Sequence, residues 1–154
     1  MKQTILDAVI QALETELERQ TQANAQSNAA TTFSAANADK QRDTTGVEAA
    51  FLAHGYAKHC IDLAHRLEEL RAMEVEDFSG QEIDIGALVE VEMNGETDWY
   101  LMLNCGGGTE VSVGGNTVTV ITPESPLGSA LMGGIEAGFI ELPSGAEGII
   151  LHVY

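Results

Sequence analysis

The chain has 154 residues, 44% of them hydrophobic, so it can bury one ordinary core or two small ones. Its formal net charge is −17, and all 7 Lys and Arg lie at or before Arg71. Nucleic-acid affinity depends chiefly on Lys and Arg, so this distribution argues against direct DNA binding and leaves weak or no RNA contact. A basic protein partner is the electrostatic alternative, and an acidic surface that serves solubility alone is the simpler one.

The cysteines and the apolar runs bear on the cellular compartment. Cys60 and Cys105 form no CxxC or similar spacing, so no disulfide framework is expected. The first residues run directly into a charged helical pattern without a signal peptide, and no apolar run approaches the roughly 18 residues of a membrane span. We therefore expect a soluble, reduced, cytoplasmic protein without membrane contact.

A first helix is predicted from Lys2 to about Phe33, because this segment has no Pro or Gly and repeats apolar residues at spacings of three and four. The apolar stripe consists of Leu6, Ile10, Leu13 and Leu17, and its polar continuation of Gln20, Asn24, Ser27 and Thr31. The distal half is therefore predicted to be a wet, weakly packed helix, with a disordered tract as the alternative.

A second helix is predicted from Gly46 to Glu74. Its apolar residues form a heptad seam of Ala53, Tyr56, Cys60, Leu63, Leu67 and Leu70. Paired with the first helix, it would complete an antiparallel two-helix hairpin, a coiled coil, over residues 1–78 with an acidic tip near residues 37–48. The hairpin should be tightest at its base, where leucines meet.

Residues 79–154 change to an alternating pattern and predict a small antiparallel sheet with one short helix. The predicted strands are 87–93, 98–104, 109–113, 117–122, 139–142 and 149–154. Ser125 is placed as the N-cap of the helix and Pro126 as its first residue, and Gly133 ends it. The fold class predicted for the whole chain is α+β.

Several patterns favour a structural role over chemistry. The glycines at 106–108 and 114–115 precede no helix and no Lys, so they are interpreted as turns rather than a phosphate cradle. His54, His59 and His65 share the second helix with Cys60 and Asp62, but their spacing does not bring them to one metal ion. No GxSxG or HExxH motif is present, so no catalytic residues are assigned and the chain is not expected to be an enzyme.

Acidic residues gather between the two predicted helices. Asp39, Asp43 and Glu48 would lie on an exposed tip, where carboxylates suit a hard cation such as Mg²⁺. The alternative is that Asp43 caps the second helix while Lys40 and Arg42 neutralise their neighbours. Spacing alone leaves both interpretations open.

The helical hairpin, its acidic tip and the small sheet domain together resemble the bacterial Gre transcription elongation factors. The resemblance rests on Ser125-Pro126, Ala130-Leu131, Gly133, Phe139 to Leu142, Pro143-Ser144-Gly145 and Ile85-Gly86-Ala87. It implies that residues 79–154 form an FKBP-like domain that docks on the rim of the secondary channel of RNA polymerase. It also implies that the hairpin enters this channel. The residues expected to bind the partner are Ser125, Pro126, Leu127, Leu131, Met132 and Gly133.

The same resemblance assigns chemistry to the tip. The family places an Asp and a Glu three residues apart, where they help to hold the Mg²⁺ of the polymerase active centre and stimulate cleavage of backtracked RNA. Asp43 can occupy the Asp position, but Gly46 stands three residues on, so Asp39 or Glu48 would supply the second carboxylate. No stably bound cofactor is implied.

Three alternatives accompany this hypothesis. The chain could occupy the channel without stimulating cleavage. It could instead be a protein-interaction module that self-associates through the hairpin, as a dimer rather than a monomer. The weakest alternative is an isolated FKBP-like enzyme, because a fold does not by itself carry a site.

Overall fold

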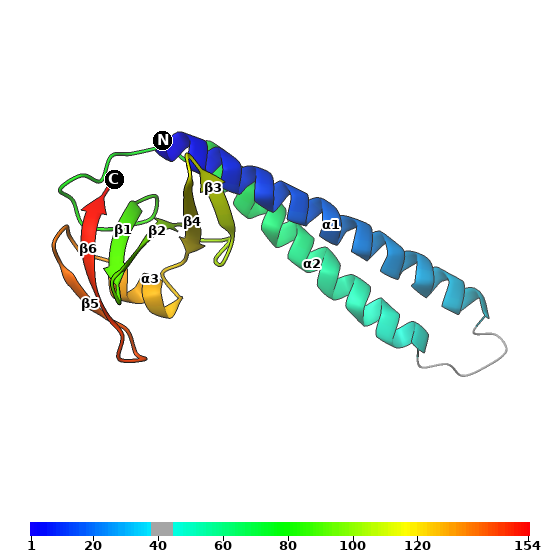
Figure 1. Ribbon diagram of the computed structural model, residues 1–154. Coiled ribbons are helices and arrows are strands. Elements are labelled where there is room, and N and C mark those ends of the chain that lie inside the picture. Colours follow the sequence, from blue (N-terminus) through cyan, green and yellow to red (C-terminus); the bar gives the residue numbers. More distant parts are fainter. Residues whose placement is uncertain (38–44) are drawn as a thin grey trace. The chain divides into compact units, whose positions relative to one another are not determined.

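The computed structural model describes the backbone of residues 1–37 and 45–154, and the side chains of residues 1–23, 25 and 57–154. The bounds of its helices and strands are α1 Lys2–Asn37, α2 Thr45–Ala72, β1 Leu88–Met93, β2 Glu96–Met102, β3 Glu110–Val113, β4 Asn116–Ile121, α3 Pro126–Leu131, β5 Phe139–Glu141 and β6 Glu147–Val153 (Figure 1). The predicted α+β class is confirmed. No helix in the described part of the chain is both long and apolar enough to span a membrane.

The chain forms two compact units. One unit contains Met1–Ala12 and Met73–Tyr154, and the other contains Leu13–Ala72. The first turns of α1 therefore belong to the same unit as the sheet, and the rest of α1 belongs with α2. The domain boundary predicted between residues 78 and 79 stays a prediction.

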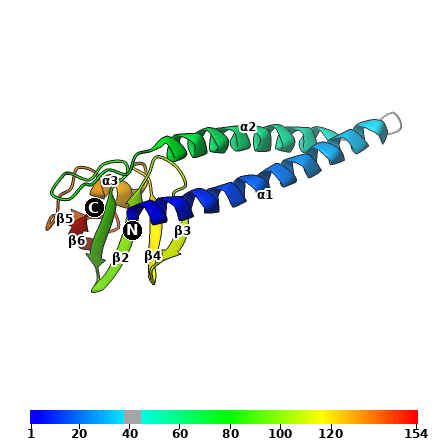
Figure 2. The ribbon, with the colours of Figure 1, turned by 90° about the horizontal axis from the view of Figure 1, so that it is seen from above.

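The helical unit is an antiparallel pair, in which α1 and α2 run beside each other in both views (Figures 1 and 2). Leu67 and Leu70 are buried, and Cys60 and Leu63 are half-buried, as the heptad seam predicts. Ala53 and Tyr56, the first two residues of that seam, lie outside the described side chains.

The matching stripe on α1 changes from apolar to polar along the helix. Leu13 is buried and Leu17 is half-buried. Gln20 follows on the same stripe, where its Nε2 donates a hydrogen bond to Glu16 Oε1 at 2.7 Å. The Gln20 Oε1 atom is buried and accepts no hydrogen bond from any described residue. An unsatisfied buried oxygen opposes tight packing, which agrees with the predicted weakening of the pair away from its base.

The six strands form one sheet in the order β3-β4-β2-β1-β6-β5. All neighbouring pairs are antiparallel except β2 and β4, which are parallel with Trp99 opposite Val118. The sheet is therefore mixed, which departs from the predicted antiparallel pattern. The reason is that the chain leaves β2, forms β3 at the sheet edge and returns through a hairpin, so β4 lies beside β2 in the same direction.

One face of the sheet carries the main hydrophobic core. This core consists of Phe78, Ile83, Ala87, Val89, Val91, Met102, Ile121, Leu131, Ile140, Ile150 and Val153. Because side chains alternate along a strand, β1 contributes every second position to it, with Val89 and Val91. β6 contributes Ile150 and Val153, which are three residues apart because the pairing of β1 and β6 shifts register between them. Leu131 is the contribution of α3, so the short helix packs on this inner face.

The start of α1 packs within the same unit. Leu6 lines a small cavity together with Leu101 and Leu103. Ile5 and Val9 are also buried, although the predicted stripe omitted both. The omission has a physical cause: a helix that packs on a sheet buries a wider face than the narrow seam of a two-helix pair.

Candidate partner-binding site

The turn before α3 is fixed by the side chain of Ser125. Its Oγ accepts a hydrogen bond from the Gly128 backbone N–H at 3.0 Å and donates one to the Thr122 carbonyl oxygen at 2.7 Å. Ser125 has an extended backbone, with φ −71° and ψ 152°, and Pro126 follows as the first helical residue. The predicted cap is confirmed, and it directs the ring of Pro126 to the exposed surface.

Gly128 allows the first turn of α3 to approach the preceding strand end. A Cβ atom at this position would lie 1.9 Å from the Thr122 carbonyl oxygen and 2.8 Å from Ser125 Oγ. No side chain fits into that space, so glycine is required for the capped turn to close. The site therefore depends on a contact between backbones rather than on side-chain packing alone.

Gly133 ends α3 and attaches it to the loop before β1. Its φ of +75° lies in the left-handed region that favours glycine. The Gly133 N–H donates to the Ile83 carbonyl oxygen at 2.9 Å, and the Ile83 N–H donates to the Gly134 carbonyl oxygen at 2.8 Å. These two backbone hydrogen bonds hold the C-terminal end of α3 to Ile83, whose side chain is part of the core.

The six predicted partner-binding residues differ in exposure. Pro126 and Gly133 are exposed, and Ser125, Leu127 and Met132 are half-buried. Leu131 has no exposed surface and packs in the core. Any contact with a partner would therefore involve Pro126 and the exposed parts of Leu127 and Met132, with Leu131 supporting them from within.

The charge around α3 is entirely negative. Glu124 and Glu136 are exposed, and residues 72–154 contain no Lys or Arg. Glu136 also accepts a hydrogen bond from the Val153 backbone N–H at 3.1 Å. The Ser125 hydroxyl is engaged at both its oxygen and its proton. The exposed proline and the surrounding carboxylates suit an apolar or basic protein surface.

The side chains of the three acidic residues predicted at the tip are outside the described set. Asp39 and Asp43 lie outside the described residues, and Glu48 belongs to α2 but its side chain is outside the described set. Their proposed Mg²⁺ chemistry stays a prediction. Within the described residues, no group of three or more His, Cys, Asp and Glu side chains is arranged to hold a metal ion.

Among the side chains that the structure describes, histidines and cysteines do not gather at a common site. His59, His65 and Asp62 are exposed on α2, which fits the interpretation of solvated side chains. The side chain of His54 is outside the described set. Cys60 is half-buried and Cys105 is buried, and neither of them is in a disulfide.

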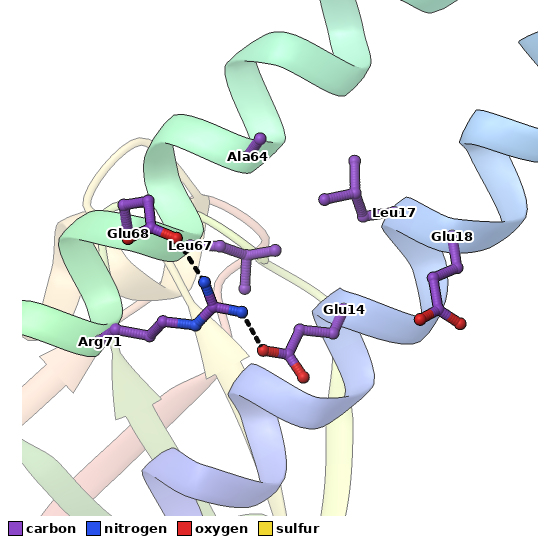
Figure 3. A pocket seen from close by; sticks show the side chains of 7 residues that line it. All are labelled: Glu14, Leu17, Glu18, Ala64, Leu67, Glu68 and Arg71. Atoms are coloured by element: carbon purple, nitrogen blue, oxygen red, sulfur yellow. Dashed lines mark hydrogen bonds and ion pairs between the residues drawn. The ribbon is translucent and has the colours of Figure 1, made fainter.

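A polar groove at the base of the helical unit was not predicted from the sequence. Arg71 on α2 forms ion pairs with Glu14 on α1 and with Glu68 one turn earlier on α2 (Figure 3). The groove has a volume of about 340 Å³ and is also lined by Leu17, Glu18, Ala64 and Leu67. Hydrogen bonding to Glu14 raises the pKa of Arg71 above its usual value. Arg71 therefore joins the two helices where their apolar seam is strongest.

Comparisons with known proteins find similar solved structures. No family model matches the chain, and no curated protein does. The transcription factor Gfh1 is 21% identical, with 96% of this chain and 94% of that chain covered and a TM-score of 0.41. GreA factor homolog 1 of Thermus thermophilus is 20% identical, with coverages of 96% and 95% and a TM-score of 0.39. Gfh1 of Thermus aquaticus is 18% identical, with coverages of 96% and 95% and a TM-score of 0.38.

Proposed function

We propose that this chain is a Gre-like modulator of transcription elongation that docks on RNA polymerase through the surface around α3. The observation that carries the proposal is the capped turn, in which Ser125 closes on Gly128 and leaves Pro126 exposed. This turn contains the Ser-Pro motif on which the resemblance to the Gre family depends. The rigid core contact of Leu131 would hold the docking surface in one conformation.

In this proposal the helical pair carries the acidic residues that would act at the polymerase active centre. The sheet unit docks at the rim of the secondary channel, and the hairpin brings Asp39, Asp43 and Glu48 toward the polymerase active centre. Carboxylate oxygens fit the ligand preference of Mg²⁺, which supplies Lewis-acid chemistry at the scissile phosphate when bound. The chain itself would be an accessory factor of the cytoplasm, with no catalytic residues of its own.

A pull-down with purified core RNA polymerase tests the docking step. Pro126→Lys places a positive charge on the exposed docking residue, which would weaken contact with an apolar surface and with a basic one. Ser112→Lys is the matched control, because Ser112 is exposed on β3 and receives the same charge. We expect wild type and Ser112→Lys to be retained and Pro126→Lys to be lost. Wild-type protein that is not retained would overturn the proposed function.

A second candidate function is self-association through the helices. Ile61 on α2 is 59% exposed and would be one of the contacts between the helices of two chains. Sedimentation of the isolated protein distinguishes the candidates. A dimer that becomes a monomer in Ile61→Ser would favour self-association, whereas a monomeric wild type would remove it.

A further inference from the structure

An exposed apolar pair lies at one edge of the sheet, away from α3. Phe139 on β5 and Ile149 on β6 are directly opposite each other in the antiparallel register. Phe139 is 82% exposed and Ile149 is 37% exposed. Single exposed apolar residues are ordinary on protein surfaces. A phenylalanine with most of its surface in water, directly beside an exposed isoleucine, instead marks this edge as a candidate interaction surface.

This pair belongs to the outer face of the sheet. Its sequence neighbours Ile140 and Ile150 are buried in the core with Leu131 of α3. Because side chains alternate between faces, Phe139 and Ile149 point to the side of the sheet opposite α3. A surface built on them is therefore separate from the docking surface around Pro126.

Carboxylates surround the apolar pair. Glu141 and Glu147 are both exposed and stand directly opposite each other, two residues along the same strands and on the same face. Like charges in this arrangement destabilise a sheet. Glu92 is also exposed and faces Ile149 from β1. Since residues 72–154 contain no Lys or Arg, no cation of this segment relieves the repulsion.

The strand that carries Phe139 is also an edge strand. β5 is the last strand in the sheet order and pairs only with β6 in the described part of the chain. An edge strand presents unpaired backbone N–H and C=O groups that another extended segment can pair with. The negative charges of Glu141 and Glu147 favour a basic segment at this edge, because an acidic or uncharged strand would leave the two carboxylates without a counter-charge.

We propose that the β5–β6 edge, defined by Phe139, Glu141, Glu147 and Ile149, binds an extended basic segment of a partner protein. An apolar side chain of that segment would lie on the Phe139 and Ile149 pair. A lysine or arginine side chain would lie between Glu141 and Glu147, turning a repulsive pair into a bridged one. The sheet of a second copy would add like charge, and a nucleic acid would be repelled by the same carboxylates.

Titration of the labelled full-length chain with two synthetic peptides, followed by NMR, tests the proposal without polymerase. The first peptide alternates lysine with valine, and the control peptide alternates lysine with serine. We expect the largest shifts from the first peptide at the β5–β6 edge and binding at least about tenfold weaker for the control, since it lacks the apolar contact. Shifts spread evenly over all acidic surfaces, or equal affinity for both peptides, would overturn the proposal.

Variants of the β5–β6 edge test its apolar contact and its charge contact separately. Phe139→Ser and the double variant Glu141→Gln with Glu147→Gln should each raise the Kd for the lysine–valine peptide by about tenfold. Glu82→Gln with Glu110→Gln removes the same charge elsewhere on the unit and should leave the Kd within about twofold. All these side chains are exposed, so the fold should tolerate the changes. A wild-type dimer that Phe139→Ser dissociates would show that a second copy occupies the edge instead.

Discussion

The ammonium group of Lys2 lies over the ring of Phe78, with its Nζ atom 4.6 Å from the ring centroid. The same nitrogen donates hydrogen bonds to the carbonyl oxygens of Glu76 at 2.6 Å and Tyr154 at 2.8 Å. Lys2 thus connects the first turn of α1, the segment before β1 and the last residue of the chain. It is the only Lys or Arg in the sheet unit.

Lys2 should make stability depend on pH. Burial lowers its pKa to about 8, although Asp77 and Glu76 raise it. An unfolded chain keeps this proton up to about pH 10.5, so between pH 8 and 10.5 the unfolded state binds more protons and the free energy of unfolding rises with pH.

Urea unfolding of wild type and Lys2→Met from pH 7 to 10.5 measures this effect, because methionine keeps an apolar stem but does not titrate. We expect the difference between the two proteins to shift by about 1 kcal/mol in favour of wild type as the pH rises. This value is discounted because the side chain is partly exposed. A difference that stays constant with pH would contradict the assignment.

Gly128→Ala should disrupt the capped turn. The added Cβ would collide with the Thr122 carbonyl oxygen, so we expect a loss of about 3 kcal/mol in the free energy of unfolding. Ser129→Ala changes the next, exposed helix residue and should cost less than about 0.5 kcal/mol. Both are measured by denaturant unfolding, and equal stability of the two variants would show that the turn does not need a glycine.

The ion pair between Arg71 and Glu14 should stabilise the helical pair modestly. Both side chains are partly exposed, so a double-mutant cycle with Arg71→Ala and Glu14→Ala should give a small favourable coupling in thermal unfolding. The coupling should shrink as salt is added. Arg19→Ala removes a pair confined to α1 and serves as the control, and an equal effect of salt on all variants would argue against a specific link.

The tip hypothesis predicts a loss of function without a loss of docking. Asp43→Asn keeps the size of the side chain but removes its charge, so cleavage of RNA in stalled polymerase complexes should fall by about tenfold or more if the carboxylate helps to hold Mg²⁺. Asp62→Asn, at an exposed acid on α2, should leave cleavage unchanged. If wild type binds polymerase but stimulates no cleavage, the chain is a channel occupant instead.

Local patterns in the sequence predicted most of the elements. The Ser125 cap, the Pro126 start and the Gly133 end of α3 were all found, because caps and turns depend on a few adjacent residues. Leu67 and Leu70 were identified as buried because helical spacing places them on one stripe. The six residues expected to bind a partner lie on α3 and its flanks, and their binding role stays a prediction. Spacing could not distinguish buried Leu131 from exposed Pro126.

Sequence alone determined which segments are helices, which are strands and where the chain turns, since these depend on periodicity over a few residues. Only the tertiary structure decided that β2 and β4 are parallel, that Ile5 and Val9 are buried, and that Phe139 faces water while Ile140 does not. Each of these depends on contacts between residues far apart in the chain. Strand pairing and the choice of the covered face are properties of the packed unit, and no local pattern encodes them.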